Sequence, residues 1–169
     1  MIRMLLYGIL ALLPYLFSSC ESVDDDRIPP YPVSLTFSTI GDWEIYGVSG
    51  AGQYKSFILT DSERYPVDYP YKGLDRTGFG GVLLLCDPNG ECIAYDLACP
   101  VEVKSNIRIC VDTENPLAGI ARCEKCGSTY NLYRSGAPVS GEALSKNYGL
   151  QRYNVRVGGS ATSYAAITR

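Results

Sequence analysis

Residues 81–96 read GVLLLCDPNGECIAYD and predict the centre of the fold. The run from Gly81 to Cys86 is continuously apolar and short enough for a buried strand. A turn signal follows at 87–90, because proline fixes φ and the Asn-Gly pair accepts left-handed backbone. The chain then returns through residues 91–96. The sequence therefore predicts a β-hairpin whose turn lies between Cys86 and Cys92.

Other short segments carry the same strand signals, and helical periodicity is nearly absent beyond the N-terminal region. The segments that we expect to form strands are 33–37, 43–48, 55–59, 107–111, 118–122, 128–133, 150–157 and 163–168. Residues 61–73 contain two prolines and several aromatic residues, and predict an irregular loop. Many short strands separated by turns indicate an all-β fold, a small sandwich or barrel. Residues 33–169 are enough for one domain with a hydrophobic core.

The first 19 residues resemble an export signal. Arg3 supplies a positive charge, and the apolar run 5–17 is shorter than the roughly 20 residues of a membrane-spanning helix. Small Ser18 and Ser19 lead directly into Cys20, which resembles the lipidated cysteine of a bacterial lipobox. The alternative is an ordinary signal peptide with an incidental cysteine at this position.

Residues 20–32 are predicted to form a lipidated tether, acidic at 21–26 and proline-rich at 29–32. We therefore expect a protein of the cell envelope of a Gram-negative-type bacterium. Lipid on Cys20 would attach it to the outer membrane, facing the periplasm or the cell surface. A protein partner is expected but not identified. The formal net charge of −3 and the absence of a basic stripe argue against a nucleic-acid partner.

Two cysteine-bearing loops follow strand-like runs. The first reads Cys99-Pro100-Val101, and the second reads Cys123-Glu124-Lys125-Cys126-Gly127-Ser128-Thr129-Tyr130. Paired loops of this kind hold a metal ion or an iron–sulfur cluster in small β domains. The chain contains no histidine, so that any site here must use sulfur, oxygen or a disulfide. Catalytic sites that need a histidine beside a serine or cysteine are excluded for the same reason.

From about Gly81 to the C-terminus, the order of these motifs resembles the Rieske family, a β fold with a [2Fe–2S] cluster between two loops. Residues 132–139, 141–143 and 150–155 resemble later segments of that family. The resemblance implies antiparallel sheets with a two-loop cysteine subdomain. Val101 stands where the family has its first histidine ligand, and Cys126 stands at the second. An ordinary Rieske cluster needs two cysteines and two histidines and is therefore argued against.

The cysteines after Cys20 leave two readings open. They number six, an even count in an oxidising compartment, which favours disulfides. Cys86 and Cys92 could then pair across the hairpin, with two further bridges across the loops. Alternatively, Cys123-x-x-Cys126 is a metal knuckle, which Cys99 and Cys110 could complete as an all-sulfur set for zinc, iron or an all-cysteine iron–sulfur centre.

We therefore expect a lipid-anchored, Rieske-like domain that has lost its histidine ligands. Its expected role is that of a structural, binding or accessory module, with disulfides in place of the cluster, rather than that of an enzyme. The alternatives are an electron-transfer protein with all-cysteine ligation at Cys99, Cys123 and Cys126, with or without Cys110, and a structural zinc site with the same ligands.

Overall fold

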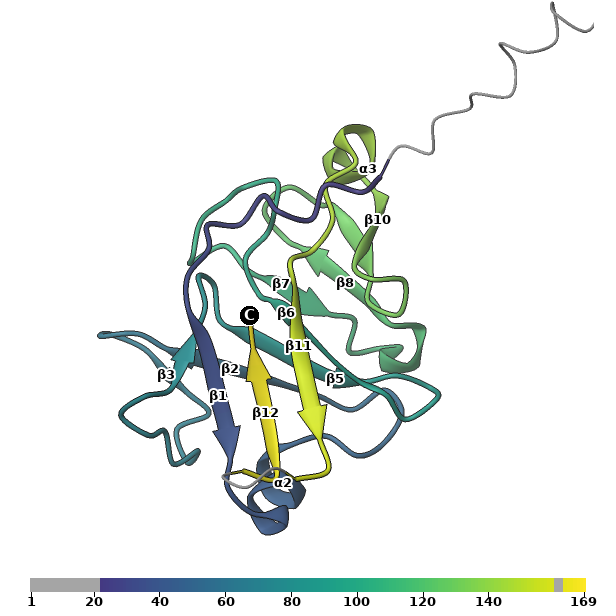
Figure 1. Ribbon diagram of the computed structural model, residues 1–169. Helices are drawn as coiled ribbons and strands as arrows, with labels where there is room; N and C mark the ends of the chain where they lie inside the picture. The colour runs from purple at the N-terminus through teal and green to yellow at the C-terminus, as the bar shows by residue number, and fades with distance from the viewer. Residues whose placement is uncertain (1–21, 160–162) are drawn as a thin grey trace, which may run out of the picture.

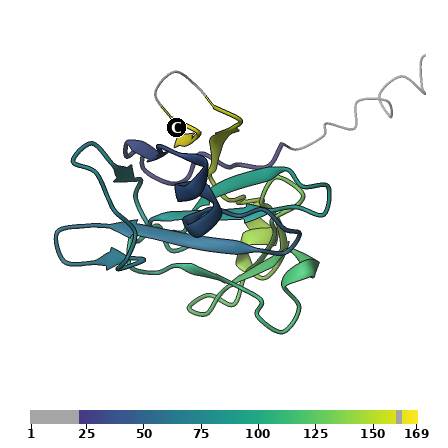
Figure 2. The same cartoon turned by 90° about the horizontal axis from the view of Figure 1, so that it is seen from below.

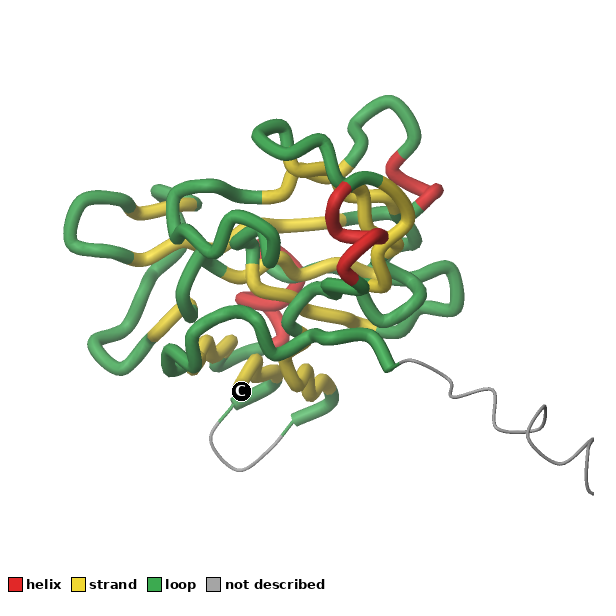
Figure 3. Tube along the Cα trace, turned by 90° about the horizontal axis from the view of Figure 1, so that it is seen from above, coloured by secondary structure: helices red, strands yellow, loops and turns green. Residues whose placement is uncertain are grey.

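The structure is a computed structural model that describes residues 22–159 and 163–169. The predicted signal peptide, residues 1–19, and Cys20 lie outside the described residues. Strands make up most of the regular secondary structure of the described chain, loops join them, and the helical segments are short (Figure 3). These helical segments are α2 (Ile40–Tyr46), the 3-10 helix η2 (Pro116–Ala118) and α3 (Glu142–Lys146). The predicted all-β class is confirmed.

The larger sheet has eight antiparallel strands and curls over itself. Their order across the sheet is β3 (Arg64–Tyr65), β2 (Tyr54–Leu59), β5 (Val82–Cys86), β6 (Cys92–Asp96), β11 (Arg152–Val157), β12 (Ala165–Thr168), β1 (Val33–Phe37) and β4 (Arg76–Thr77). In Figure 1, β1, β12 and β11 pass in front of β2 and β5 at a steep angle. The sheet therefore forms a half-barrel with an inner face.

The smaller sheet has four antiparallel strands and lies beside the half-barrel with α3 at its edge (Figure 1). Its order is β10 (Ala137–Ser140), β9 (Thr129–Asn131), β8 (Ile120–Cys123) and β7 (Ile109–Val111). An isolated bridge between Ala98 and Arg108 connects the end of β6 to the start of this sheet. Because Ala98 precedes Cys99, this bridge places the first cysteine loop at the junction between the two sheets.

Two hydrophobic cores lie on opposite faces of β5, which is why that strand is continuously apolar. Val82, Leu84 and Cys86 point into the core inside the half-barrel. Leu83 and Leu85 point into the second core, between the two sheets. Successive side chains of a strand alternate between its faces, so a strand covered on both sides needs apolar residues throughout. The predicted hairpin of β5 and β6 is confirmed, with Cys86 opposite Cys92.

The predicted strand at residues 43–48 is wrong, because this segment belongs to α2. Thr39 begins the helix with a capping box. Its hydroxyl oxygen accepts a hydrogen bond from the Asp42 backbone N–H, and the Asp42 carboxylate accepts one from the Thr39 backbone N–H. Trp43 is buried in the inner core, whereas Ile45 is exposed. In Figure 1, α2 lies at the lower end of the molecule, and in the view from below it lies near the middle (Figure 2). Every other predicted strand overlaps an observed one.

The described part of the predicted tether lies against the domain. Ile28 is only 1% exposed, and Arg27 stacks over the ring of Tyr148 at 4.3 Å. Asp24 donates its backbone N–H to the Asn147 carbonyl at 2.9 Å, beside the end of α3. The segment before Pro29 is thus held against the domain at Asp24, Arg27 and Ile28. Among the described residues, no helix is long and apolar enough to cross a membrane.

Candidate metal centre

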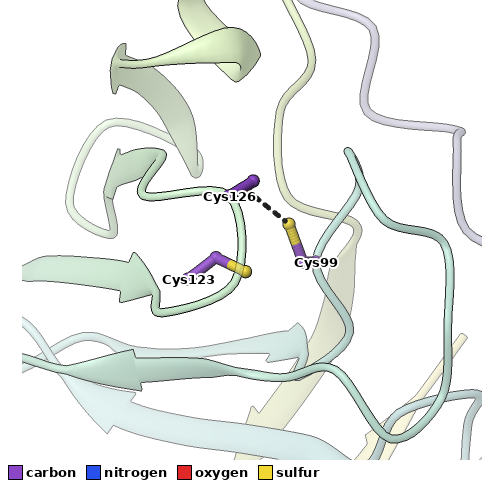
Figure 4. A group of neighbouring side chains, drawn as sticks. All are labelled: Cys99, Cys123 and Cys126. Carbon is purple, nitrogen blue, oxygen red and sulfur yellow. Dashed lines mark hydrogen bonds between the residues drawn. The ribbon is translucent and has the colours of Figure 1, made fainter.

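Three cysteines from the two loops converge in the structure. Cys99 follows β6, Cys123 ends β8, and Cys126 lies in the turn before β9. Their Sγ atoms all lie within 4.8 Å of one another, and the Cys99 and Cys126 Sγ atoms are 3.6 Å apart. Figure 4 shows Cys99 facing the other two from the opposite loop. Cys99 and Cys123 are buried, and Cys126 is partly exposed.

The first loop is a tight turn closed by backbone hydrogen bonds. The Cys99 N–H donates to the Ile107 carbonyl at 3.0 Å, and the Val103 N–H donates back to the Cys99 carbonyl at 2.9 Å. Val103 has φ of 49°, a left-handed conformation that is unfavourable for a β-branched residue. Such strain persists only where the surroundings over-determine the backbone. The loop is therefore held in one conformation around Cys99.

Asp96, the last residue of β6, anchors this loop to the large sheet. Its carboxylate is fully buried and accepts backbone N–H groups from Phe79, Gly80 and Ala98 at 2.7–3.0 Å. The Tyr153 hydroxyl donates a fourth hydrogen bond at 2.5 Å. Burial raises the pKa of Asp96, and the bonds from Tyr153 and the three backbone groups oppose that rise. The carboxylate therefore joins the glycine-rich segment before β5 to the residue that precedes Cys99.

The second loop is a knuckle built on backbone geometry. Cys123 donates its N–H to the Ser128 carbonyl at 3.0 Å, and Gly127 donates its N–H to the Cys123 carbonyl at 2.8 Å. Gly127 has φ of 70°, and no atom lies within 4 Å of where its Cβ would stand. The glycine is therefore required by the left-handed backbone and not by lack of space. Ser128 accepts the Ala143 N–H at 3.1 Å, which fixes α3 on this loop.

Hydrogen bonds distribute the protons unequally among the sulfurs. Burial raises the pKa of the Cys99 thiol to about 12, although the Tyr130 hydroxyl and two backbone groups of its own loop bond its sulfur. Burial acts in the same direction on Cys126, but hydrogen bonds from the Ser128 side chain and backbone, together with those to the Cys99 and Cys123 sulfurs, outweigh it and lower the pKa. Of Cys99 and Cys126, the more exposed Cys126 therefore loses its proton more readily.

Tyr130 completes the buried wall of the site. Its hydroxyl lies 3.5 Å from the Cys99 Sγ atom, and its side chain is fully buried. Burial raises the pKa of Tyr130 far above its usual range, and the neighbouring cysteines add to the rise. Tyr130 is therefore a neutral hydrogen-bonding partner of the Cys99 sulfur and not a phenolate.

The other three described cysteines lie away from this group. Cys110 is exposed on β7 between two buried neighbours, so that strand alternation turns it outward. Cys86 and Cys92 lie at the inner core, on the opposite side of β5. All six are free, and no disulfide is present among the described residues. The structure thus unites Cys99, Cys123 and Cys126 but leaves Cys110 outside the set.

The residues present do not fit an ordinary Rieske cluster. Val101 packs against the core between the sheets and offers no ligand atom. The group contains three cysteines, whereas a [2Fe–2S] cluster needs four protein ligands. No further histidine, cysteine or carboxylate joins these three among the described residues. The three sulfurs are close enough together to hold one metal ion.

Three supporting residues were not singled out from the sequence. They are Asp96, Ser128 and Tyr130. The signal for Asp96 is a carboxylate at the end of an otherwise apolar strand, directly before a cysteine loop. Ser128 and Tyr130 belong to the quoted second loop, but their contacts with α3 and with the Cys99 sulfur could not be predicted from that motif. Comparisons with protein-family models and with curated proteins find no match for this chain.

Proposed function

We propose that this protein is an exported, lipid-anchored β domain that binds one thiophilic metal ion, zinc in preference to iron, through Cys99, Cys123 and Cys126. Its role is that of a structural or accessory binding module rather than an enzyme. The observation that carries the proposal is the convergence of three Sγ atoms within 4.8 Å from two separately anchored loops.

The sulfur spacing supports a preformed ion site. Zinc–sulfur bonds of about 2.3 Å in tetrahedral geometry place sulfur atoms roughly 3.8 Å apart. The Cys99 and Cys126 Sγ atoms are separated by 3.6 Å, close to this edge length. A disulfide requires about 2.05 Å. Little movement of either loop is needed for an ion to reach all three sulfurs.

The donor set favours zinc. Thiolates select soft or borderline cations, and zinc accepts three protein ligands together with water or another molecule in the fourth position. The Tyr130 hydroxyl contacts the Cys99 sulfur and is not one of the three converging ligands, which leaves that position to an external ligand. The buried sulfurs and their hydrogen-bond donors supply the surroundings that orient thiolate ligands.

A bridge between Cys99 and Cys126 is the second candidate, and their proximity favours it. The bridge would be one of the disulfides expected to replace a lost cluster. It would leave Cys123 as a buried, unpaired thiol, since Cys110 lies outside the group. The metal site uses all three sulfurs and is therefore the better account.

The Rieske relationship and the anchor are parts of the same proposal. The order of the cysteine loops along the chain supports the relationship, with cysteine replacing one histidine and valine the other. The lipobox pattern at Cys20 supports the anchor. Ser22 already contacts Asn147, whose amide donates to its carbonyl at 2.9 Å. A lipid on Cys20 would thus hold the α3 end of the domain next to the bilayer.

Zinc titration of the reduced protein tests the site. We expect one zinc per chain, and a loss of affinity of at least about tenfold in Cys99→Ser, Cys123→Ser and Cys126→Ser. Cys110→Ser is the matched control and should bind as the wild type does. Failure of the reduced wild type to bind zinc, or full affinity in Cys99→Ser, would contradict the proposal.

Two further measurements separate the alternatives. Stoichiometric iron with absorption between about 350 and 600 nm in the native-source protein would assign an iron centre instead of zinc. For the anchor, labelled lipid should be incorporated into the wild type and lost in Cys20→Ser. Incorporation that survives this substitution would remove the anchor from the proposal.

A further inference from the structure

Cys86 and Cys92 lie opposite each other in the β5–β6 hairpin. They belong to the core inside the half-barrel, whereas Cys99, Cys123 and Cys126 belong to the core between the two sheets. Asp87 donates its N–H to the Glu91 carbonyl at 2.9 Å, so residues 87 and 91 are a hydrogen-bonded pair. Since such pairs alternate along antiparallel strands, Cys86 and Cys92 form a non-hydrogen-bonded pair. The backbone of Cys86 accordingly bonds to the opposite neighbour, accepting from Gly52 and donating to Gln53.

This pairing has the geometry of a disulfide site. Directly opposite residues in a non-hydrogen-bonded pair have Cα atoms about 4.5 Å apart and side chains on the same face. Disulfides span Cα separations of about 4.4–6.8 Å. Both side chains belong to the inner core cluster, which confirms that they share a face. The strands therefore need no change of register to bring the sulfurs together.

The two sulfurs differ in access. Cys86 is 1% exposed and packs inside the half-barrel. Cys92 is partly exposed and lines two surface hollows, one beside Glu91 and Arg152 and the other beside Trp43. An external reagent can therefore reach Cys92 while Cys86 is shielded.

We propose that Cys86 and Cys92 form a reversible redox site, in which Cys92 exchanges with an external disulfide and Cys86 completes a cross-strand bridge. Cys92 first loses its proton, against a pKa that burial and the nearby negative groups raise to about 11. Its sulfur then attacks one sulfur of the external disulfide, and the other sulfur leaves and takes up a proton as a thiol, so that a mixed disulfide remains on Cys92. Cys86 then loses its proton, attacks the Cys92 sulfur and releases the second external thiol. Two protein thiols are oxidised, and one external disulfide is reduced to two thiols.

This site is independent of the proposed metal centre. Cys86 lies on the inner face of β5, whereas the three converging cysteines belong to the core on its other face. Bound zinc should therefore leave the exchange at Cys92 unchanged.

In the test, the folded full chain is equilibrated with reduced and oxidised glutathione, and the remaining thiols are blocked. The protein is then digested with a protease that cleaves on the C-terminal side of glutamate residues. Cleavage at Glu91 separates fragment 64–91, which holds Cys86, from fragment 92–102, which holds Cys92 and Cys99. We expect the two fragments to be joined by a reducible bridge. The bridge should persist in Cys99→Ser and disappear in Cys92→Ser.

Single variants test the order of attack. Cys86→Ser should accumulate a glutathione adduct on Cys92. In Cys92→Ser, an adduct on Cys86 should form at least about tenfold more slowly, because that sulfur is reached only when the strand opens. Unlinked fragments in the oxidised wild type would overturn the proposal. A bridge lost in Cys99→Ser, or equal adduct rates in the two variants, would overturn it as well.

Discussion

The Tyr153 hydroxyl donates a 2.5 Å hydrogen bond to the buried carboxylate of Asp96, and so ties β11 to the end of β6. The same carboxylate holds the backbone of Ala98, one residue before Cys99. A side chain in the middle of the large sheet thereby supports the loop that carries the first sulfur.

Removing this hydroxyl should destabilise the fold. In Tyr153→Phe we expect a loss of about 1.5–3 kcal/mol in the free energy of unfolding, the usual contribution of a hydrogen bond to a charged group. Urea denaturation measures it. Tyr164→Phe, immediately before β12, is the control and should change stability much less. Equal losses of unfolding free energy in the two variants would show that the hydrogen bond to Asp96 does not stabilise the fold.

Ser128 links the second loop to α3 and hydrogen-bonds the sulfur of Cys126. In Ser128→Ala, we expect zinc affinity to fall about tenfold or more, as is typical when a residue that orients a ligand is lost. Competition with a chelating dye measures the affinity. Ser145→Ala removes an exposed hydroxyl of α3 that bonds the Glu142 carbonyl and should leave affinity unchanged. Parallel losses in both variants would attribute the effect to α3 and not to the sulfur.

The left-handed Val103 predicts an unusual order of stabilities. A side chain in this conformation costs roughly 1–2 kcal/mol, which glycine avoids. Val103→Gly should therefore unfold at a higher urea concentration than Val103→Ala, although glycine usually destabilises relative to alanine. The reverse order would mean that the loop carries no such strain.

Asp87 should make the hairpin sensitive to acid. Hydrogen bonds from the Glu91 backbone and then from Asn89 and Gly90 lower the pKa of Asp87 against the effect of burial. The folded state therefore holds this proton less tightly than the unfolded state, and the stabilisation is complete only above the unfolded pKa of about 3.9. It is lost as the pH falls through the lower, folded value.

Asp87→Asn should accordingly be less stable than the wild type near neutral pH, and the difference should shrink as the pH falls below about 4. Urea midpoints measured across this range provide the test. Asp61→Asn, which makes the same change in an exposed loop outside the hairpin, is the control variant. A difference for Asp87→Asn that is independent of pH would contradict the assignment.

Periodicity was enough to predict the fold class and the central hairpin. Residues 82–86 are apolar at every position because β5 is covered on both faces. The Asp-Pro-Asn-Gly sequence that follows them strongly favours a turn. Residues 43–48 were mistaken for a strand, since their alternation fits both a strand and a short helix. The capping box of Thr39 and Asp42, just upstream, was the signal that distinguishes the two.

The candidate site was predictable only in part. Cys99, Cys123 and Cys126 were named because two loops each ending a strand tend to meet. Cys110 was offered as the sulfur that could complete a four-cysteine set, but its position between two buried residues of β7 turns it outward. Asp96 stands out locally as a carboxylate at the end of an apolar strand, but its bonds to the backbone of Phe79 and Gly80, in a segment before β5, could not be predicted from that pattern.

The central claim is that three cysteines bind one ion. X-ray absorption at the zinc edge of the zinc-loaded full chain tests this most directly. We predict three sulfur neighbours at about 2.3 Å and one oxygen or nitrogen neighbour. Cys126→Ser should lose one sulfur from this shell, and Cys110→Ser should lose none. A shell with one sulfur or none, or a shell of four sulfurs that loses one in Cys110→Ser, would contradict the three-cysteine site.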